Sequence, residues 1–379
     1  MIAGSFDTSM IWAIFPEIGL VVLALLVLIA DLTLGEVRRR WLGWLTAAGL
    51  LIIFGVSFAV ALPGEPRLIW GGMLRQDLLS FLFQMIFLFG AGVTTLFAVD
   101  SDAIGKRGEF YILLLASTLG MNLMASASDL IMLFLAIEMT SIPLYALAGF
   151  LTKDYKSTES GFKYFLFGST TSAVMLYGLS LLYGFTGTTQ VYELAAQLQA
   201  GQLTPFVLVA VTLLILVGFG FKVSAAPFHF WAPDVYEGAP TPVAGFLSTA
   251  SKAAGFAVLM RFLLAVFPTT APYWAIIIGT LSTLSMIIGN TLALTQKNIK
   301  RLLAYSSIAQ AGYMLIGVAC VTPLGFSATA FYLIAYLVTN LAAFGIVTIV
   351  GRLTGSDELS AYAGLSRRSP GLALALLVA

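Results

Sequence analysis

Eleven apolar stretches, each close to the length of a membrane crossing, follow one another along this 379-residue chain. They fall at about 10–30, 42–62, 78–99, 110–127, 129–151, 160–185, 204–222, 242–266, 273–295, 300–321 and 325–351. A helix needs about 20 apolar residues to cross a bilayer, where every backbone polar group must find its partner within the protein. Because 59% of the residues are hydrophobic and only 10% are charged, the composition excludes a soluble globular protein. The sequence predicts an all-α, polytopic membrane protein.

A twelfth apolar stretch begins at Gly371, and the sequence stops inside it at Ala379. A membrane protein would not normally end in the middle of such a stretch. We therefore expect eleven complete helices and the start of a twelfth here, with further helices to follow.

The charge and the chemical side chains exclude several classes of function. A net charge of +1 is not the basic footprint of a nucleic-acid-binding protein. The single cysteine, Cys320, and the single histidine, His229, are too few for an iron–sulfur cluster or a bis-histidine haem within this chain. We expect any redox chemistry coupled to this protein to take place elsewhere.

Basic residues are divided unevenly between the two sets of loops. Thirteen of the 19 lysines and arginines lie in the connections that follow odd-numbered apolar stretches, whereas the opposite loops hold only Arg67 and Arg75. The remaining four lie within the stretches themselves. Because cytoplasmic loops carry the excess of Lys and Arg, this bias predicts an N-terminus outside the cell and the thirteen basic residues in the cytoplasm.

Charged residues interrupt several of the apolar stretches, among them Glu138, Lys163, Lys222, Lys252 and Arg261. On lenient insertion scales each charge at the middle of a membrane costs roughly 2.5–3.5 kcal/mol, so intramembrane charges indicate a functional site. Lys252 lies far from the ends of its stretch, Glu138 lies near the middle of its own, and Lys222 directly precedes a proline-rich segment. The pattern predicts a path for ions or protons.

The segment Phe219–Val243 indicates a broken helix beside one of these charges. It reads FGFKVSAAPFHFWAPDVYEGAPTPV and carries four prolines close to Lys222. Proline removes a backbone donor, and irregular backbone at membrane depth is tolerated only against protein or a water-filled cavity. A helix broken next to a charge is typical of a transport site.

A buried lysine next to a carboxylate can act as a proton carrier. A lysine in water keeps its proton at neutral pH, whereas burial makes the neutral amine accessible. A carboxylate at 4–6 Å attracts the ammonium by roughly 3–4 kcal/mol at an effective dielectric constant of 20. Moving a charge against 100 mV takes about 2.3 kcal/mol, so approach and withdrawal of Glu138 would suffice to load and unload a lysine. His229, between Lys222 and Lys252, is placed to bridge them as a switchable imidazole.

Simpler interpretations stay open for each of these residues. Lys163 and Arg261 lie near helix ends, where a long side chain can extend to the membrane surface. Glu138 and one lysine can form a static ion pair, and a lone histidine such as His229 is often structural. Capping explains the carboxylates at helix ends or in the break, Asp129, Asp234 and Glu237. Polar residues in Tyr305–Tyr313 (YSSIAQAGY), with Thr339 and Asn340, fit either a hydrated half-channel or interhelical hydrogen bonds.

At these residues the sequence resembles the antiporter-like membrane subunits of respiratory complex I, and among them the subunit N branch. The resemblance rests on IWAIFPEIGL at 11–20, LFLAIEMTSIPLYALAGF at 133–150, GFKVSAAPFHFWAPDVYEGAPTPVAGFLSTASKAAGF at 220–256 and IKRLLAYSSIAQAGYMLIG at 299–317. It covers essentially the whole chain. The phrase PDVYEGAPTPV is similar to subunit N rather than to its two larger paralogues.

The resemblance implies a fold of about fourteen helices with two inverted five-helix repeats, each containing a broken helix. It divides the chain into an N-terminal three-helix segment at 1–109, a first repeat at 110–267 and an incomplete second repeat at 268–379. The proton-translocating residues that it implies, by match to the family motifs, are Glu138, Lys163, Lys222, His229 and Lys252. A further lysine is expected on the twelfth helix.

The resemblance also implies a function: a proton-translocating subunit of a NADH:quinone oxidoreductase in the bacterial plasma membrane. This chain is expected to bind no cofactor or metal, while NADH, FMN, iron–sulfur clusters and a quinone are used by other subunits. Its expected partners are the paralogous antiporter-like subunits, small membrane subunits and the lipid bilayer, with no nucleic acid. Two alternatives remain, a subunit of a multi-subunit Na⁺/H⁺ antiporter and a structural subunit whose charges only hold helices together.

Overall fold

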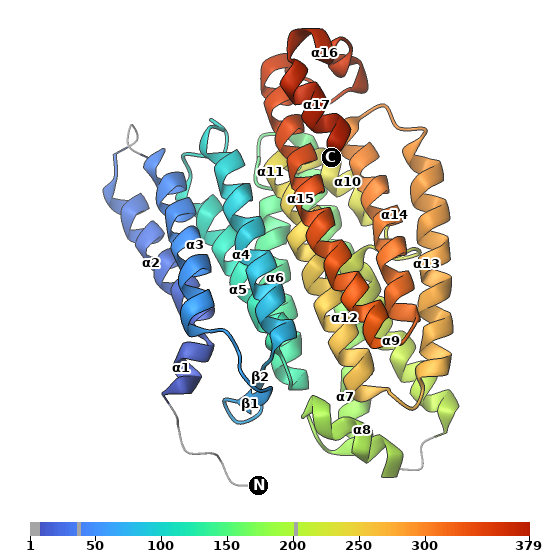
Figure 1. Ribbon diagram of the computed structural model, residues 1–379. Helices are drawn as coiled ribbons and strands as arrows, with labels where there is room; N and C mark the ends of the chain where they lie inside the picture. The colour runs from blue at the N-terminus through green and yellow to red at the C-terminus, as the bar shows by residue number, and fades with distance from the viewer. Residues whose placement is uncertain (1–7, 36–38, 201–203) are drawn as a thin grey trace. The chain divides into compact units, whose positions relative to one another are not determined.

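The computed structural model describes residues 8–35, 39–200 and 204–379 (Figure 1). The chain divides into two compact units, each assembled from three stretches. The first consists of Met1–Leu144, Ser169–Phe219 and Ala253–Trp274, and the second of Tyr145–Gly168, Gly220–Lys252 and Ala275–Ala379. The predicted segments 1–109, 110–267 and 268–379 concern internal repeats, which this division does not test, so they stay a prediction.

The eleven predicted crossings are confirmed. In the described part of the chain eleven helical spans are long and apolar enough to cross a membrane. They are α2 (Phe15–Thr33), α3 (Trp41–Val60), α4 (Leu78–Val99), α5 (Gly108–Ser126), α6 (Leu130–Ala148), α7 (Tyr155–Thr186), α9 (Pro205–Val223), the compound span Thr241–Val266, α13 (Ala271–Ala293), α14 (Ile299–Ala319) and α15 (Pro323–Thr354).

Short elements connect or interrupt these spans. The compound span consists of α11 (Thr241–Phe246), a π-helical turn (Leu247–Ser251) and α12 (Lys252–Val266). The remaining elements are α1 (Ser9–Ala13), β1 (Arg67–Ile69), β2 (Leu74–Gln76), α8 (Val191–Ala200), α10 (Trp231–Gly238), a 3₁₀ turn (Leu359–Tyr362), α16 (Leu365–Arg368) and α17 (Pro370–Val378). The nine residues of α17 begin the predicted twelfth apolar stretch.

Local sequence signals set several helix ends. Asp77 and Ser80 form a capping box at the start of α4, each side chain accepting a hydrogen bond from the other's backbone N–H. Asn298 caps α14 by accepting from two backbone N–H groups. Gly355 ends α15 with φ +68°, a left-handed conformation that only glycine adopts without strain. Such caps supply partners for backbone groups that the helix itself leaves free.

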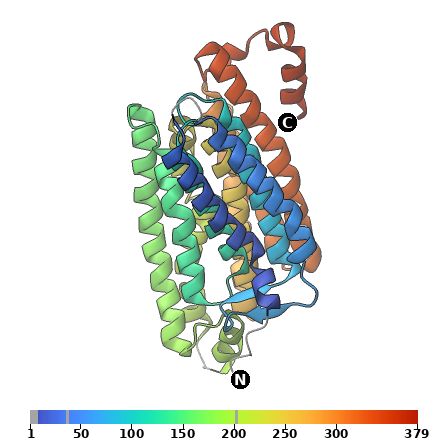
Figure 2. The ribbon, with the colours of Figure 1, turned by 90° about the vertical axis from the view of Figure 1, so that its left-hand side faces the viewer.

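In the first unit, α2, α3, α4 and α5 pack against one another, α2 with α3 and α5, and α4 with α3 and α5. The antiparallel hairpin of β1 and β2 joins α3 to α4 and pairs Arg67 with Gln76 and Ile69 with Leu74. Figures 1 and 2 show α1 and this hairpin together at one end of the helices. The hairpin therefore brings polar side chains to the ends of α2 and α4.

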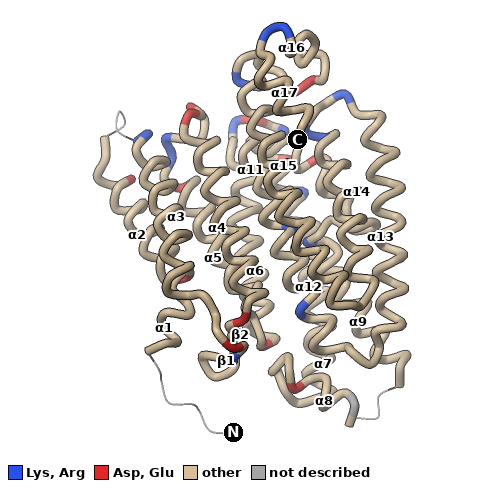
Figure 3. Tube along the Cα trace, viewed as in Figure 1, with Lys and Arg blue, Asp and Glu red and all other residues tan. Residues whose placement is uncertain are grey.

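In the second unit, α14 packs against α10 and α15, and α11 packs against α15. An aromatic stack fills the space around α10: the ring of Trp231 lies 4.4 Å from that of Tyr164 and 5.1 Å from that of Phe221. Figure 3 shows that most charged residues lie at helix ends, while most of the helical length carries none. A charge along a helix is therefore an exception that needs a local explanation.

Candidate functional site

The helix predicted to break after Lys222 is interrupted. α9 ends at Val223, and α10 begins only at Trp231. Between them the backbone N–H of Ala225 donates to the carbonyl of Gly220 at 2.9 Å, and that of Ala226 donates to Ser285 Oγ at 2.8 Å. These bonds satisfy backbone groups that the missing helical turns leave without partners, as membrane depth requires. Lys222, in the last turn of α9, is only 4% exposed.

His229 lies within the break and is 3% exposed. Its Nδ1 is buried and has no hydrogen-bond partner in the described part of the chain. Burial, and to a lesser extent the charge of Lys252, lower the pKa of this imidazole. The structure thus brings together two of the residues that the sequence predicted to act in one path.

Lys252 lies directly after the π-helical turn Leu247–Ser251 and is only 1% exposed. Its Nζ donates to Ser307 Oγ at 2.8 Å and to the Ser307 carbonyl at 2.9 Å. It forms no ion pair with a described carboxylate of its own unit. Single π-turns inside helices are frequent at functional sites, because the extra residue alters where the next side chains point.

A buried polar network continues from Ser307 into α15. Asn340 Nδ2 donates to Ser248 Oγ at 2.6 Å and to the Tyr336 hydroxyl at 3.1 Å. Tyr336 in turn interacts with Ser307, the partner of Lys252. Hydroxyl groups both donate and accept hydrogen bonds, so Ser307 and Tyr336 are able to pass a proton along such a chain.

Lys163 belongs to a charged cluster rather than to the buried core of the unit. Its Nζ lies 2.6 Å from Asp234 Oδ2 and 2.7 Å from Glu159 Oε1, and the side chain is 33% exposed. Arg301 Nη1 lies 2.6 Å from Asp234 Oδ1 and 2.9 Å from Glu237 Oε2. With Lys156 and Ser160, these residues line a cavity of about 160 Å³. The cluster ties α10, the second half of the broken helix, to α7 and α14.

The prediction that Asp234 and Glu237 serve as helix caps is wrong. Partial burial opposes their ionisation, but hydrogen bonds and charges from their basic partners outweigh it and lower the pKa of both carboxyls. Asp234 and Glu237 lie three residues apart on one face of α10, so Arg301 Nη1 reaches both carboxylates. For Asp129 capping is confirmed, since Oδ1 accepts from the backbone N–H of Ile131 at 2.9 Å.

Glu138 lies on α6, in the first unit, and is half-buried. Its Oε1 is buried without a hydrogen-bond partner among the described residues. α5 approaches α6 closely here, because a Cβ atom on Gly120 would lie only 2.5 Å from the backbone nitrogen of Thr140. Pairing of Glu138 with a lysine of the second unit stays a prediction.

Arg261 corrects another expectation. Instead of extending to the membrane surface, it is 5% exposed and forms a two-pronged ion pair with Asp77, at 2.7 and 2.8 Å. The Tyr192 hydroxyl accepts a further hydrogen bond from Arg261 Nη1 at 2.8 Å. Asp77 lies 184 residues from Arg261 in the sequence. Its Oδ2 also accepts a hydrogen bond from Arg75 Nε at 2.9 Å. The charge in this span is structural, and it holds the end of α12 to the start of α4.

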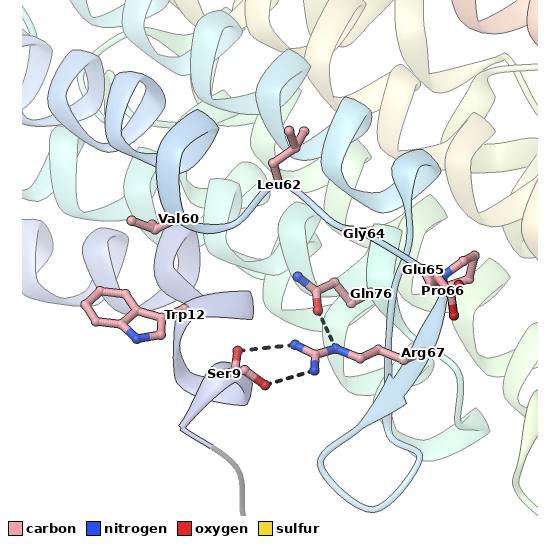
Figure 4. A pocket seen from close by; sticks show the side chains of 9 residues that line it. All are labelled: Ser9, Trp12, Val60, Leu62, Gly64, Glu65, Pro66, Arg67 and Gln76. Carbon is pink, nitrogen blue, oxygen red and sulfur yellow. Dashed lines mark hydrogen bonds between the residues drawn. The ribbon is translucent and has the colours of Figure 1, made fainter.

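A larger cavity of about 650 Å³ opens at the hairpin end of the first unit (Figure 4). Ser9 and Gln76 bind Arg67 there, and Trp12 projects beside them. This cavity is not lined by any of the predicted lysines. Over the described ranges no three His, Cys, Asp or Glu side chains gather as metal ligands.

Residues 127–379 match a protein family described as NADH:quinone oxidoreductase/Mrp antiporter, transmembrane region. The chain is 41% identical to NADH-quinone oxidoreductase subunit N 2 of Chloroherpeton thalassium, over 97% of this chain and 74% of the relative. It is 42% identical to NADH-quinone oxidoreductase subunit N of Desulfovibrio desulfuricans, over 97% of this chain and 75% of the relative. The chain thus spans about three quarters of the length of both relatives.

Two solved structures are similar over nearly the whole chain. A chain of respiratory complex I from Thermus thermophilus superposes with a TM-score of 0.77 at 35% identity, over 96% of this chain and 77% of that one. A chain of the Mrp complex from Dietzia sp. superposes with a TM-score of 0.83 at 21% identity, over 98% and 70% of the two chains. The second likeness concerns the fold alone. Both support the antiporter-like fold predicted from the sequence.

Proposed function

We propose a proton path through the buried lysines of this chain, on the premise that it belongs to the NADH:quinone oxidoreductase/Mrp antiporter family of membrane subunits. Its relatives include NADH-quinone oxidoreductase subunit N. It is a multi-pass membrane protein with the antiporter-like fold. As a subunit of NADH:quinone oxidoreductase it works with the other membrane subunits of that complex. Its part of the reaction is to move protons while quinone is reduced elsewhere.

The observation that carries the proposal is the environment of Lys252. An ammonium group that is 1% exposed, with a serine as partner and no carboxylate of its own unit, is held at high cost. The free-energy cost of burying this group falls once it loses its proton, because a neutral amine needs only hydrogen-bond partners and no counter-charge. A π-turn directly precedes it and allows local adjustment without unfolding. These features favour a lysine that changes its protonation state over one that only holds helices together.

In the proposed path Lys222 and Lys252 carry the proton, and His229 lies between them in the break. Glu138 sets the charge balance by approaching or leaving a lysine, and Lys163 responds through its ion pairs with Asp234 and Glu159. Ser307 accepts the hydrogen bond of Lys252 and leads to Tyr336. Proton transfer among these groups, directly or through water, changes no oxidation state, so no redox centre is needed in this chain. NADH, FMN, iron–sulfur clusters and the quinone would be bound by other subunits.

Replacing Lys222 with alanine is the direct test. In the intact complex, reconstituted into vesicles, Lys222→Ala is expected to lower the number of protons pumped per NADH oxidised, because the path loses a carrier. The control is Lys106→Ala, which removes an exposed lysine that forms an ion pair with Asp102 in the loop between α4 and α5. Normal pumping per NADH in an assembled Lys222→Ala complex would contradict the proposal. Sodium-driven proton flux without NADH would instead favour an antiporter.

The proposed orientation has the N-terminus outside the cell and the plasma membrane as its location. The thirteen basic residues of one set of loops support this orientation, against two in the other. Cys320, the only cysteine, is exposed at the end of α14 and should lie outside.

A membrane-impermeant maleimide added to intact cells is therefore expected to label Cys320. As a control, Cys320→Ser combined with Lys106→Cys should be labelled only in inside-out vesicles. The opposite pattern would reverse the orientation.

A further inference from the structure

One buried carboxyl group of the first unit has no place in the lysine path. Glu17, in the first turn of α2, is only 6% exposed. Gln84 of α4, equally buried, donates from Nε2 to Glu17 Oε1 at 2.8 Å. The second oxygen, Oε2, is buried and has no hydrogen-bond partner in the described part of the chain. A carboxylate in this position would form no ion pair with any described cation, and one of its two oxygens would be buried without a donor.

A small pocket adjoins Glu17. Its volume of about 10 Å³, measured as the space open to the centre of a water molecule, is about enough for one water. Ala13 and Phe81 are among its apolar walls. Its polar lining consists of Glu17, Arg75, Gln76, Ser80, Gln84 and Ser126. A water in this space would have several polar partners, as a buried water requires.

The small pocket and the open cavity of Figure 4 have one lining residue in common. Gln76 lines both the 650 Å³ cavity and the small pocket. Its Oε1 accepts from Arg67 Nε at 2.9 Å, and its Nε2 donates to the Ala61 carbonyl at 3.4 Å. The long second bond is weak, so the amide is held firmly on one side only. Gln76 therefore stands between the surface and the carboxyl group.

From this arrangement we propose that Glu17 is a proton-binding site, held as a neutral carboxylic acid and exchanging its proton with the hairpin end of the first unit past Gln76. The proton comes from water in the open cavity, and Glu17 Oε2 accepts it through the water of the small pocket. In the neutral acid Oε2 becomes a donor toward that water, while Oε1 keeps the bond from Gln84. The acid thereby satisfies all of its polar atoms.

Two features act against the neutral form, and both are weaker than desolvation. The first turn of a helix favours a negative charge through the helix dipole, but this effect is small compared with the cost of burying an unpaired carboxylate. Among the residues lining the pocket Arg75 is the only other charged one. Its guanidinium is bound to Asp77 at 2.9 Å and lies over the Tyr192 ring at 4.3 Å, so it is already engaged. α1, α3 and α5 contribute no titratable side chain to the lining.

Infrared difference spectroscopy on the intact reconstituted complex tests the proposal directly. At neutral pH, the spectrum of the wild type minus that of Glu17→Gln is expected to contain the C=O stretch of one protonated carboxylic acid. The band should shift in D₂O and disappear as the pH is raised, when the acid loses its proton. Glu17→Gln closely imitates the neutral acid in shape and hydrogen bonding, so the variant should assemble normally. The matched control is Glu65→Gln, because Glu65 is exposed at the mouth of the same open cavity.

Gln76→Ala tests the route. Removing one hydrogen-bonded barrier should speed hydrogen–deuterium exchange of the Glu17 band roughly threefold to tenfold. A Glu17 band that is absent throughout the neutral range would overturn the proposal, as would a band that sodium removes at constant ionic strength. Unchanged exchange in Gln76→Ala would overturn the route. None of these readouts depends on proton pumping, so they separate this site from the proposed lysine path.

Discussion

Lys252→Arg is expected to stop proton transfer through this chain as completely as Lys252→Ala does. Arginine keeps a positive charge in the same place, but its guanidinium does not release a proton in proteins. Burial disfavours the charged form of a lysine, so a lysine as buried as Lys252 is able to lose its proton. A positioned proton donor or acceptor typically contributes 10²–10⁴-fold to a transfer rate, so we expect a loss of roughly that size in the flux through this chain.

The measurement is NADH-driven acidification in vesicles that contain the intact complex, compared with the rate of NADH oxidation. Lys106→Arg, a surface change beside Asp102, is the matched control. Lys252→Met shows whether the buried charge is needed for assembly, because well-packed apolar replacement of a buried charge is often neutral for stability. Retention of pumping in Lys252→Arg would contradict a protonation cycle at Lys252 and favour a static charge.

Arg261→Met should destabilise the first unit by about 3–5 kcal/mol, the typical cost of leaving one member of a buried ion pair alone. Arg261 is 5% exposed and Asp77 13% exposed, so water replaces little of the lost interaction. Arg75 keeps its single bond to Asp77 and limits the loss. The midpoint of thermal unfolding of the detergent-solubilised complex, followed on this chain, measures the effect. Arg67→Met, at an exposed arginine of the same hairpin, is the control.

The same pair makes a prediction about pH. Burial opposes ionisation of Asp77, but the hydrogen bonds and charge of Arg261 prevail and lower the pKa of the carboxyl. A carboxyl whose pKa is lower in the folded state stabilises the fold above its unfolded value of about 3.9 and loses that contribution as the pH falls through its folded value.

In Arg261→Met the pKa of Asp77 is no longer held low, so this carboxyl contributes less to acid destabilisation. The free energy of unfolding of the variant should therefore fall less steeply than that of the wild type as the pH drops below about 4. Adding Asp77→Asn should restore part of the lost stability. Failure of that second change to recover any stability would show that packing of the arginine, not its charge, matters.

Much of this architecture follows from local patterns in the sequence. Hydropathy and length predict all eleven crossings, since a membrane leaves a helix no other way to satisfy its backbone. Prolines and glycines between Phe219 and Val243 predict the break after Lys222, because these residues act through the backbone of their own segment. Burial of Lys222 and Lys252 also follows, from the apolar residues that flank them.

Local patterns cannot identify partners that lie far apart along the chain. The sequence contains no signal that Arg261 meets Asp77, or that Lys163 and Arg301 share Asp234. Lys163 and Arg261 were open to a simpler interpretation, because a long side chain near a helix end can extend to the membrane surface. The π-turn before Lys252 has no distinct sequence signal either, since its residues form an ordinary helical pattern. The orphaned oxygen of Glu17 becomes visible only once α2 and α4 are packed.

The sequence by itself determined that this protein is a helical membrane protein with charged groups in its interior and a break beside one of them. These properties depend on how each segment interacts with lipid and on its own backbone, and both are set by neighbouring residues. Tertiary structure alone decided which charges are paired and which are left with hydroxyl groups or without a partner. The energy of a buried charge depends on atoms within a few ångströms, and folding brings those atoms from distant parts of the chain.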